Sequence, residues 1–136
     1  MWVQALEDWT DLIENQGMGA WSAMMMRRRF YAGALSRAAS QWFESQQATA
    51  GATCVLGAVD VLVGMDLSED LHLAAMPTLI LHLDNSPFIP VSVVSALKDG
   101  LPDARLHVFS HARHGLPFSH ARACSALTSQ FIADHD

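Results

Sequence analysis

One histidine follows a segment that has the pattern of a buried strand. His114 lies just past the strand-like run at residues 105–109, and an earlier apolar run at residues 77–82 reads as a second strand. In open parallel sheets, ligands and catalytic side chains gather beyond the carboxyl ends of the strands. A neutral imidazole near physiological pH can take a proton from a nucleophile. The pattern therefore indicates His114 as a candidate general base; the alternative is an inert loop histidine with local hydrogen bonds.

Several histidines close together in the sequence also suggest a metal site. They are His107, His111, His114 and His120. Only two residues separate His111 from His114, whereas His107 belongs to a predicted strand, so they form no rigid ligand set on one face. We expect partly exposed loop histidines, with no metal and no other cofactor.

The two cysteines, Cys54 and Cys124, cannot make the disulfide framework of a small secreted domain. A reducing compartment is the simpler interpretation. Cys54 falls within an apolar helical run, where burial would keep its thiol protonated and unreactive. We therefore predict that Cys54 is not a nucleophile.

The basic cluster Arg27-Arg28-Arg29 has two interpretations. It could guide a carboxylate substrate into a cleft by charge-assisted hydrogen bonds. It could instead be the solvated end of a helix that balances acidic neighbours, and this second interpretation is favoured.

Helical periodicity dominates the first half of the chain. Helices are predicted over residues 2–16, 19–30, 36–47 and 49–63. Gly17 stops the first helix and Ser36 can cap the third. The fourth helix is apolar almost all round, which predicts that it is largely buried.

Strands and helices alternate in the second half. The prediction is a capped turn at residues 66–71, a strand at 78–83, a helix at 91–98, a strand at 105–109 and a helix opened by Pro117. The first strand is apolar on both faces apart from His82, as in a parallel strand that is covered on both sides. The fold class is therefore α/β, with a helical region over residues 1–66 and a strand-helix region over residues 67–136.

The order of these elements resembles the last third of an α/β-hydrolase. In that superfamily a Pro-Thr-Leu strand, here residues 77–82, precedes an acid-bearing turn, a helix, a strand and a loop with the catalytic histidine. Upstream, Gly19-Ala-Trp21, Arg29-Phe30 and Asp66-Leu67 are similar to the cap and cap exit of the enol-lactone hydrolase type. The resemblance implies a cap, an incomplete parallel sheet, and a catalytic role for His114.

Two parts of the superfamily's catalytic pattern are altered or missing. Along the His-Gly-x-x-Asp-x-x-x-Pro pattern that would run from His82 to Pro90, Ser86 occupies the acid position and Leu83 replaces the glycine. Asp84 comes two residues before that position, where the superfamily often has a non-catalytic aspartate, and it is the remaining candidate for the acid. No Gly-x-Ser-x-Gly nucleophile elbow occurs in the 136 residues.

The activity implied by the resemblance is hydrolysis of a small ester or lactone. Without a nucleophile, we expect the chain to be inactive alone and active only if complemented by a hydrolase front half. The alternative is a non-catalytic homodimeric protein, derived from a hydrolase and used for binding or assembly.

Composition limits the partners. The chain is 51% hydrophobic and 16% charged, with a net charge of −6, which argues against a nucleic-acid surface. The most apolar stretch, residues 50–65, contains Asp60 and is shorter than the roughly 20 residues of a membrane helix. The acidic start lacks the features of a signal peptide. We expect a cytoplasmic protein without membrane partners, in which a homodimer covers the unpaired strand edges.

Overall fold

The computed structural model describes residues 2–135. It divides into two compact units, Met1–Met65 and Asp66–Asp136. The first contains only helices among its described residues, and the second contains a two-stranded sheet with helices around it.

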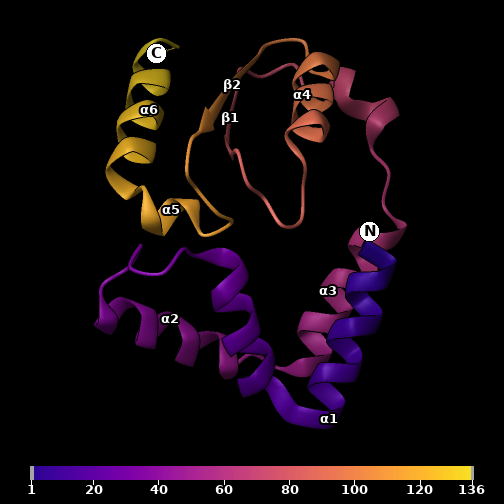
Figure 1. Ribbon diagram of the computed structural model, residues 1–136. Coiled ribbons are helices and arrows are strands. Elements are labelled where there is room, and N and C mark those ends of the chain that lie inside the picture. The colour runs from indigo at the N-terminus through magenta and orange to yellow at the C-terminus, as the bar shows by residue number, and fades with distance from the viewer. Residues whose placement is uncertain (1, 136) are drawn as a thin grey trace. The chain divides into compact units, whose positions relative to one another are not determined.

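Three helices make the first unit: α1 (Trp2–Arg29), α2 (Arg37–Ala48) and α3 (Ala52–Gly64). Helix α1 packs against both of the others (Figure 1). It is interrupted at Gly17, whose φ of 80° lies in the left-handed region that glycine adopts without steric cost. The predicted break between the first two helices is therefore confirmed.

Aromatic and sulfur-containing side chains form the interior of the first unit. Trp9 and Trp21 are buried and meet edge to face, with ring centroids 5.6 Å apart. Met25 is 1% exposed. Of the apolar face predicted for the first helix, Trp9 and Ile13 are buried, while the side chains of Trp2 and Leu6 lie outside the described residues.

A polar contact ties α1 to α2 inside this unit. The fully buried Ser22 donates its hydroxyl to the Glu44 carbonyl oxygen at 2.7 Å. The Arg29 guanidinium donates to the side-chain oxygen of Gln47 and lies over the Phe43 ring at 5.8 Å. Desolvation lowers the pKa of Arg29. Arg29 is thus partly buried between helices, so the prediction of a fully solvated basic cluster is wrong for this residue.

The predicted cap of α2 is confirmed, whereas the predicted burial of α3 is wrong. The Ser36 hydroxyl accepts the Ala39 N–H at 3.2 Å and caps α2 as predicted. By contrast, α3 buries only Val59, and Val61 and Leu62 are more than half exposed. Cys54 is exposed as well. The prediction of a largely buried fourth helix with a buried thiol is wrong, because α3 packs on α1 along a single stripe.

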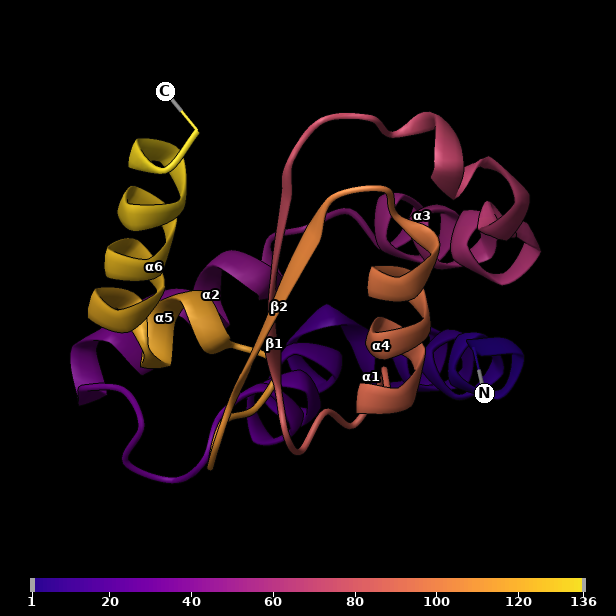
Figure 2. The ribbon, with the colours of Figure 1, turned by 90° about the horizontal axis from the view of Figure 1, so that it is seen from above.

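The second unit begins with the short 3-10 helix η1 (Ser68–Leu73), followed by β1 (Thr78–Leu83), α4 (Val91–Gly100) and β2 (Ala104–Phe109). The strands are parallel, with Thr78 paired to Ala104 and Leu83 to Phe109. Figure 2 shows α4 on one side of the sheet and α6 (Ala121–Ala133) on the other. The predicted strand-helix-strand unit is confirmed.

One helix prediction needs correction. The segment opened by Pro117 is not continuous, because the short helix α5 (Leu116–Ser119) ends at Ser119 and α6 begins at Ala121. The break turns α6 along the sheet, where Cys124 and Leu127 pack against a core of Leu83, Phe109, Ala112 and Leu116. An ion pair between Arg105 of β2 and Asp134, at 2.8 Å, holds the end of α6.

Candidate active site

The candidate site lies at the carboxyl ends of β1 and β2, where two loops meet. Asp84 follows β1 directly, and its N–H donates to the Phe109 carbonyl oxygen at 3.0 Å. Its carboxylate accepts the N–H of His111 at 2.8 Å and the N–H of Ala112 at 3.3 Å. Asp84 therefore ties the first loop to the loop that carries His114.

The backbone of the second loop has an unusual conformation at this contact. His111 has a φ of 55°, in the left-handed region that side chains other than glycine seldom adopt. The next residue, Ala112, is 1% exposed and belongs to the core. The loop is thus held by a buried methyl group and by the Asp84 carboxylate just before it reaches His114.

These contacts determine the ionisation of Asp84. The hydrogen bond from the His111 N–H is the largest cause of a lowered pKa for this carboxyl, and the hydrogen bond from Ala112 and the charge of His111 act in the same direction. Asp84 is therefore an anion whose oxygen atoms both accept backbone N–H groups. This geometry fits a residue that fixes the loop better than it fits the acid of a catalytic triad.

His114 lines a cavity of about 430 Å³. Its ring packs edge to face on the buried Phe88, with centroids 4.7 Å apart. The cavity is mainly apolar and is lined by Leu81, His82, Leu83, Ile89, His114, Leu116, Pro117, Cys124 and Thr128. An imidazole that lines an apolar cavity can exchange a proton with a group that enters the cavity.

Ser86, at the acid position of the superfamily pattern, forms hydrogen bonds within its own turn. Its hydroxyl oxygen accepts the N–H of Ile89 at 3.0 Å and the N–H of Phe88 at 3.3 Å. A hydroxyl cannot stabilise an imidazolium as a carboxylate does. The structure therefore gives Ser86 a turn-forming role.

Two cavity residues were not predicted as functional. His82 is buried and hydrogen-bonds through Nε2 to the Ile89 carbonyl oxygen at 3.0 Å, which orients the turn. Cys124 faces the same cavity, and burial raises the pKa of its thiol. The one signal available in the sequence was the position of His82 within an otherwise apolar run; nothing local distinguished Cys124.

The other two histidines of the cluster, His107 and His120, make separate contacts. His107 packs on Phe109 from β2, and His120 accepts or donates a hydrogen bond with the Ser119 hydroxyl at 2.9 Å. Among residues 2–135, no group of His, Cys, Asp and Glu is placed to hold a metal ion.

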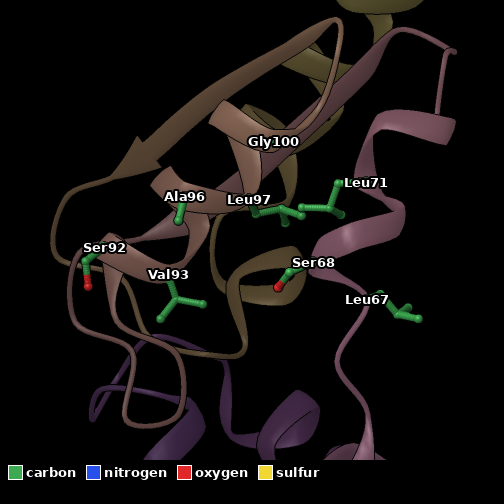
Figure 3. A pocket seen from close by; sticks show the side chains of 8 residues that line it. All are labelled: Leu67, Ser68, Leu71, Ser92, Val93, Ala96, Leu97 and Gly100. Atoms are coloured by element: carbon green, nitrogen blue, oxygen red, sulfur yellow. The ribbon is translucent and has the colours of Figure 1, made fainter.

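A second hollow lies away from the strand ends, between η1 and α4. It has a volume of about 610 Å³, and Figure 3 shows Leu71 and Leu97 pointing toward each other across it. Gly100 allows the close approach, because a Cβ built there would lie 2.7 Å from Cδ1 of Leu71. The hollow contains no ionisable side chain among its lining residues, which are Leu67, Ser68, Leu71, Ser92, Val93, Ala96, Leu97 and Gly100.

The helices within residues 2–135 are short or polar for a membrane span. No single helix there is long and apolar enough to cross a bilayer; α2 and α3 have sufficient length and apolar composition only as a pair, which is bent by 86°.

Known proteins resemble the chain in both sequence and structure, although no protein-family model matches it. A 2-hydroxymuconate semialdehyde hydrolase of Pseudomonas putida is 31% identical over 71 residues, which are 51% of this chain and 25% of that protein. A 2-hydroxy-6-oxononadienedioate/2-hydroxy-6-oxononatrienedioate hydrolase of a Pseudomonas species is 36% identical over 58 residues, which are 43% of this chain and 20% of that protein.

Solved structures match nearly the whole chain. The enol-lactonase of Burkholderia xenovorans LB400 has a TM-score of 0.86 at 14% identity, over 96% of this chain and 50% of that one. A bromoperoxidase of Bacillus anthracis has a TM-score of 0.84 at 20% identity, over 94% of this chain and 48% of that one.

These sequence and structural matches agree on one superfamily. The chain belongs to the α/β-hydrolase superfamily. It spans about half the length of the solved α/β-hydrolases that it matches, and its two parallel strands are a partial α/β-hydrolase sheet.

Proposed function

We propose that the chain is the histidine-bearing part of an α/β-hydrolase that cleaves small esters or lactones. The observation that carries the proposal is the pair of hydrogen bonds from the His111 and Ala112 N–H groups to Asp84, which fix the loop whose His114 lines an apolar cavity. The first unit, residues 1–65, is proposed as the cap.

His114 is the general base in this proposal. Its imidazole takes the proton from a nucleophilic hydroxyl as that oxygen attacks the carbonyl carbon of the substrate. The imidazolium then passes the proton to the leaving alkoxide, and a water molecule repeats the sequence on the acyl intermediate.

The nucleophile and the oxyanion donors must come from outside these 136 residues, which contain no Gly-x-Ser-x-Gly elbow. The chain alone should therefore show no esterase activity. The test is hydrolysis of p-nitrophenyl acetate by the chain, and then by the chain mixed with a polypeptide that carries the elbow half of a related esterase.

The expected result is that activity appears only in the mixture and is lost with His114→Ala. His107→Ala is the matched control, because His107 is an exposed histidine on β2 outside the cavity. Burst kinetics from the chain alone would contradict the requirement for an external nucleophile. Equal activity of the mixture with His114→Ala would remove His114 from the mechanism.

A non-catalytic role is the second candidate, and the turn at Ser86 favours it. With the Ser86 hydroxyl engaged by two backbone N–H groups, the superfamily's acid position contains no carboxylate. A chain that served in binding or assembly would not need one. In that case no elbow-bearing partner would restore hydrolysis.

A further inference from the structure

A buried histidine, His82, takes no part in the proton transfers of the proposed reaction. It lies on β1 and is 6% exposed, and its Nε2 atom is 3.0 Å from the Ile89 carbonyl oxygen. Because a carbonyl oxygen only accepts hydrogen bonds, Nε2 must carry the proton and donate it to this bond. A buried hydrogen bond of this kind is costly to break, since the partner that remains is left unsatisfied. His82 therefore fixes the Ile89 carbonyl in the turn that follows β1.

The same turn is fixed at a second point. The Ser86 hydroxyl oxygen accepts the N–H of Phe88 at 3.3 Å and the N–H of Ile89 at 3.0 Å. Ile89 is thus held through both of its backbone polar groups, its N–H by Ser86 and its C=O by His82. These hydrogen bonds determine the position of Phe88, whose side chain is 5% exposed.

Phe88 connects this turn to the loop of the proposed general base. Its ring meets the His114 ring edge to face, with centroids 4.7 Å apart and planes inclined by 76°. Aromatic rings prefer such an arrangement to a face-to-face stack, so a fixed Phe88 ring favours one orientation of the imidazole. The cavity is lined by other described residues, His82 and His114 among them, and not by Phe88. Phe88 therefore acts on the imidazole and not on a molecule inside the cavity.

We infer that Phe88 and His82 are positioning residues for His114. Phe88 orients the imidazole by direct contact, and His82 acts through Phe88 by holding the Ile89 carbonyl. This inference rests on the proposed role of His114 as general base. In a complete triad, the carboxylate both orients the imidazole and stabilises its charged form. Here the aromatic contact performs the first of these two tasks, while a serine occupies the acid position.

NMR of the chain by itself tests the arrangement without any hydrolysis. Nuclear Overhauser effects should join the ring protons of Phe88 and His114, and the imidazole nitrogen shifts of His82 should show the proton on Nε2. His82→Leu removes the donor, so the effects between Phe88 and His114 should disappear. His82→Gln keeps a side-chain N–H that can reach the same carbonyl, so they should persist. A His82 proton on Nδ1 in the wild type, or persistent effects in His82→Leu, would overturn the inference.

Phe88→Leu tests the direct contact, and it does so even if His82→Leu fails to fold. Without the aromatic partner, the His114 ring should lose its single orientation, which carbon relaxation measures as a lower order parameter. Phe131→Leu is the matched control, because Phe131 lies beside Arg105 on α6, and it should leave the His114 ring unchanged. An equally ordered His114 ring in Phe88→Leu would contradict the role of Phe88.

Hydrolysis by the mixture with an elbow-bearing half separates this inference from the proposed function. Phe88→Leu should lower kcat roughly two- to tenfold, the range expected for the loss of one aromatic contact. KM should stay nearly the same, because Phe88 does not line the cavity. An unchanged kcat in an active mixture would overturn the inference and leave the proposed function standing. A wild-type mixture without activity would count against the proposed function, and the NMR results would still decide whether Phe88 and His82 position His114.

Discussion

The carboxylate of Asp84 accepts the backbone N–H of His111 at 2.8 Å, across 27 positions of the chain. Together with the bond from Ala112, this contact joins the loop after β1 to the loop after β2. Its consequence is that the position of His114 depends on a residue that is not itself at the superfamily's acid position.

Removing the Asp84 carboxylate should loosen the His114 loop. In Asp84→Ala, the N–H groups of His111 and Ala112 lose their acceptor, so both amides should exchange with solvent faster and the melting temperature should fall. Amide hydrogen exchange by NMR measures this directly. Asp103→Ala is the matched control, because that side chain is exposed and is not part of the contact. Unchanged exchange at His111 in Asp84→Ala would show that these hydrogen bonds are not needed.

The stability of the chain should fall in acid. The pKa values of Asp84, Asp134 and Asp66 are all lowered in the folded chain, by the His111 N–H, by Arg105 and by Ser68 respectively. The unfolded chain therefore binds more protons in the window below its carboxyl pKa of about 3.9. The stabilisation is fully present above that value and is lost as pH falls through the lower folded pKa values.

Melting temperatures between pH 2 and pH 7 measure this dependence. Asp84→Asn should reduce the acid-dependent part of the curve, because one of the three contributing carboxyls is gone. A profile for Asp84→Asn that parallels the wild type would contradict the assignment for Asp84.

Ser86→Asp should improve any hydrolysis that the chain supports with an elbow-bearing partner. An aspartate there can still accept the N–H groups of Phe88 and Ile89, as short polar side chains do in turns, and it adds a carboxylate at the superfamily's acid position. In the Ser-His-Asp triad, the carboxylate that stabilises the imidazolium raises kcat by about 10⁴, so Ser86→Asp should raise kcat by up to this factor. Ser92→Asp, on the exposed side of α4, is the control. If both variants change kcat equally, the gain is a charge effect and not a restored acid.

Substitution of His111 by glycine should stabilise the second unit. The φ of 55° costs most side chains about 1 kcal/mol, and glycine adopts it without that cost. Urea denaturation should show a higher midpoint for His111→Gly. Ser110→Gly serves as the matched change, because Ser110 is outside the left-handed region and gains only flexibility from glycine, so its midpoint should fall. A midpoint that falls for His111→Gly as it does for Ser110→Gly would mean that the backbone at His111 is not strained.

Local chemistry was enough to predict most of the elements. Gly17 breaks α1, Ser36 caps α2 and Pro90 precedes α4 because turns and helix ends depend on residues that are close in the sequence. The apolar runs of β1 and β2 predicted parallel strands, and with them the position of His114 beyond a strand end. The resemblance to α/β-hydrolases rested on this same order of elements.

Only the tertiary structure decided what those elements touch. The apolar composition of α3 predicted burial, yet a helix is buried only where another surface covers it, and among the described residues the main contact of α3 is with α1. The hydrogen bonds of Asp84 and the placement of His82 and Cys124 on one cavity join residues far apart in the chain. Periodicity identifies the faces of an element, whereas strand register and helix direction determine which side chains meet, and these depend on the packing of the whole unit.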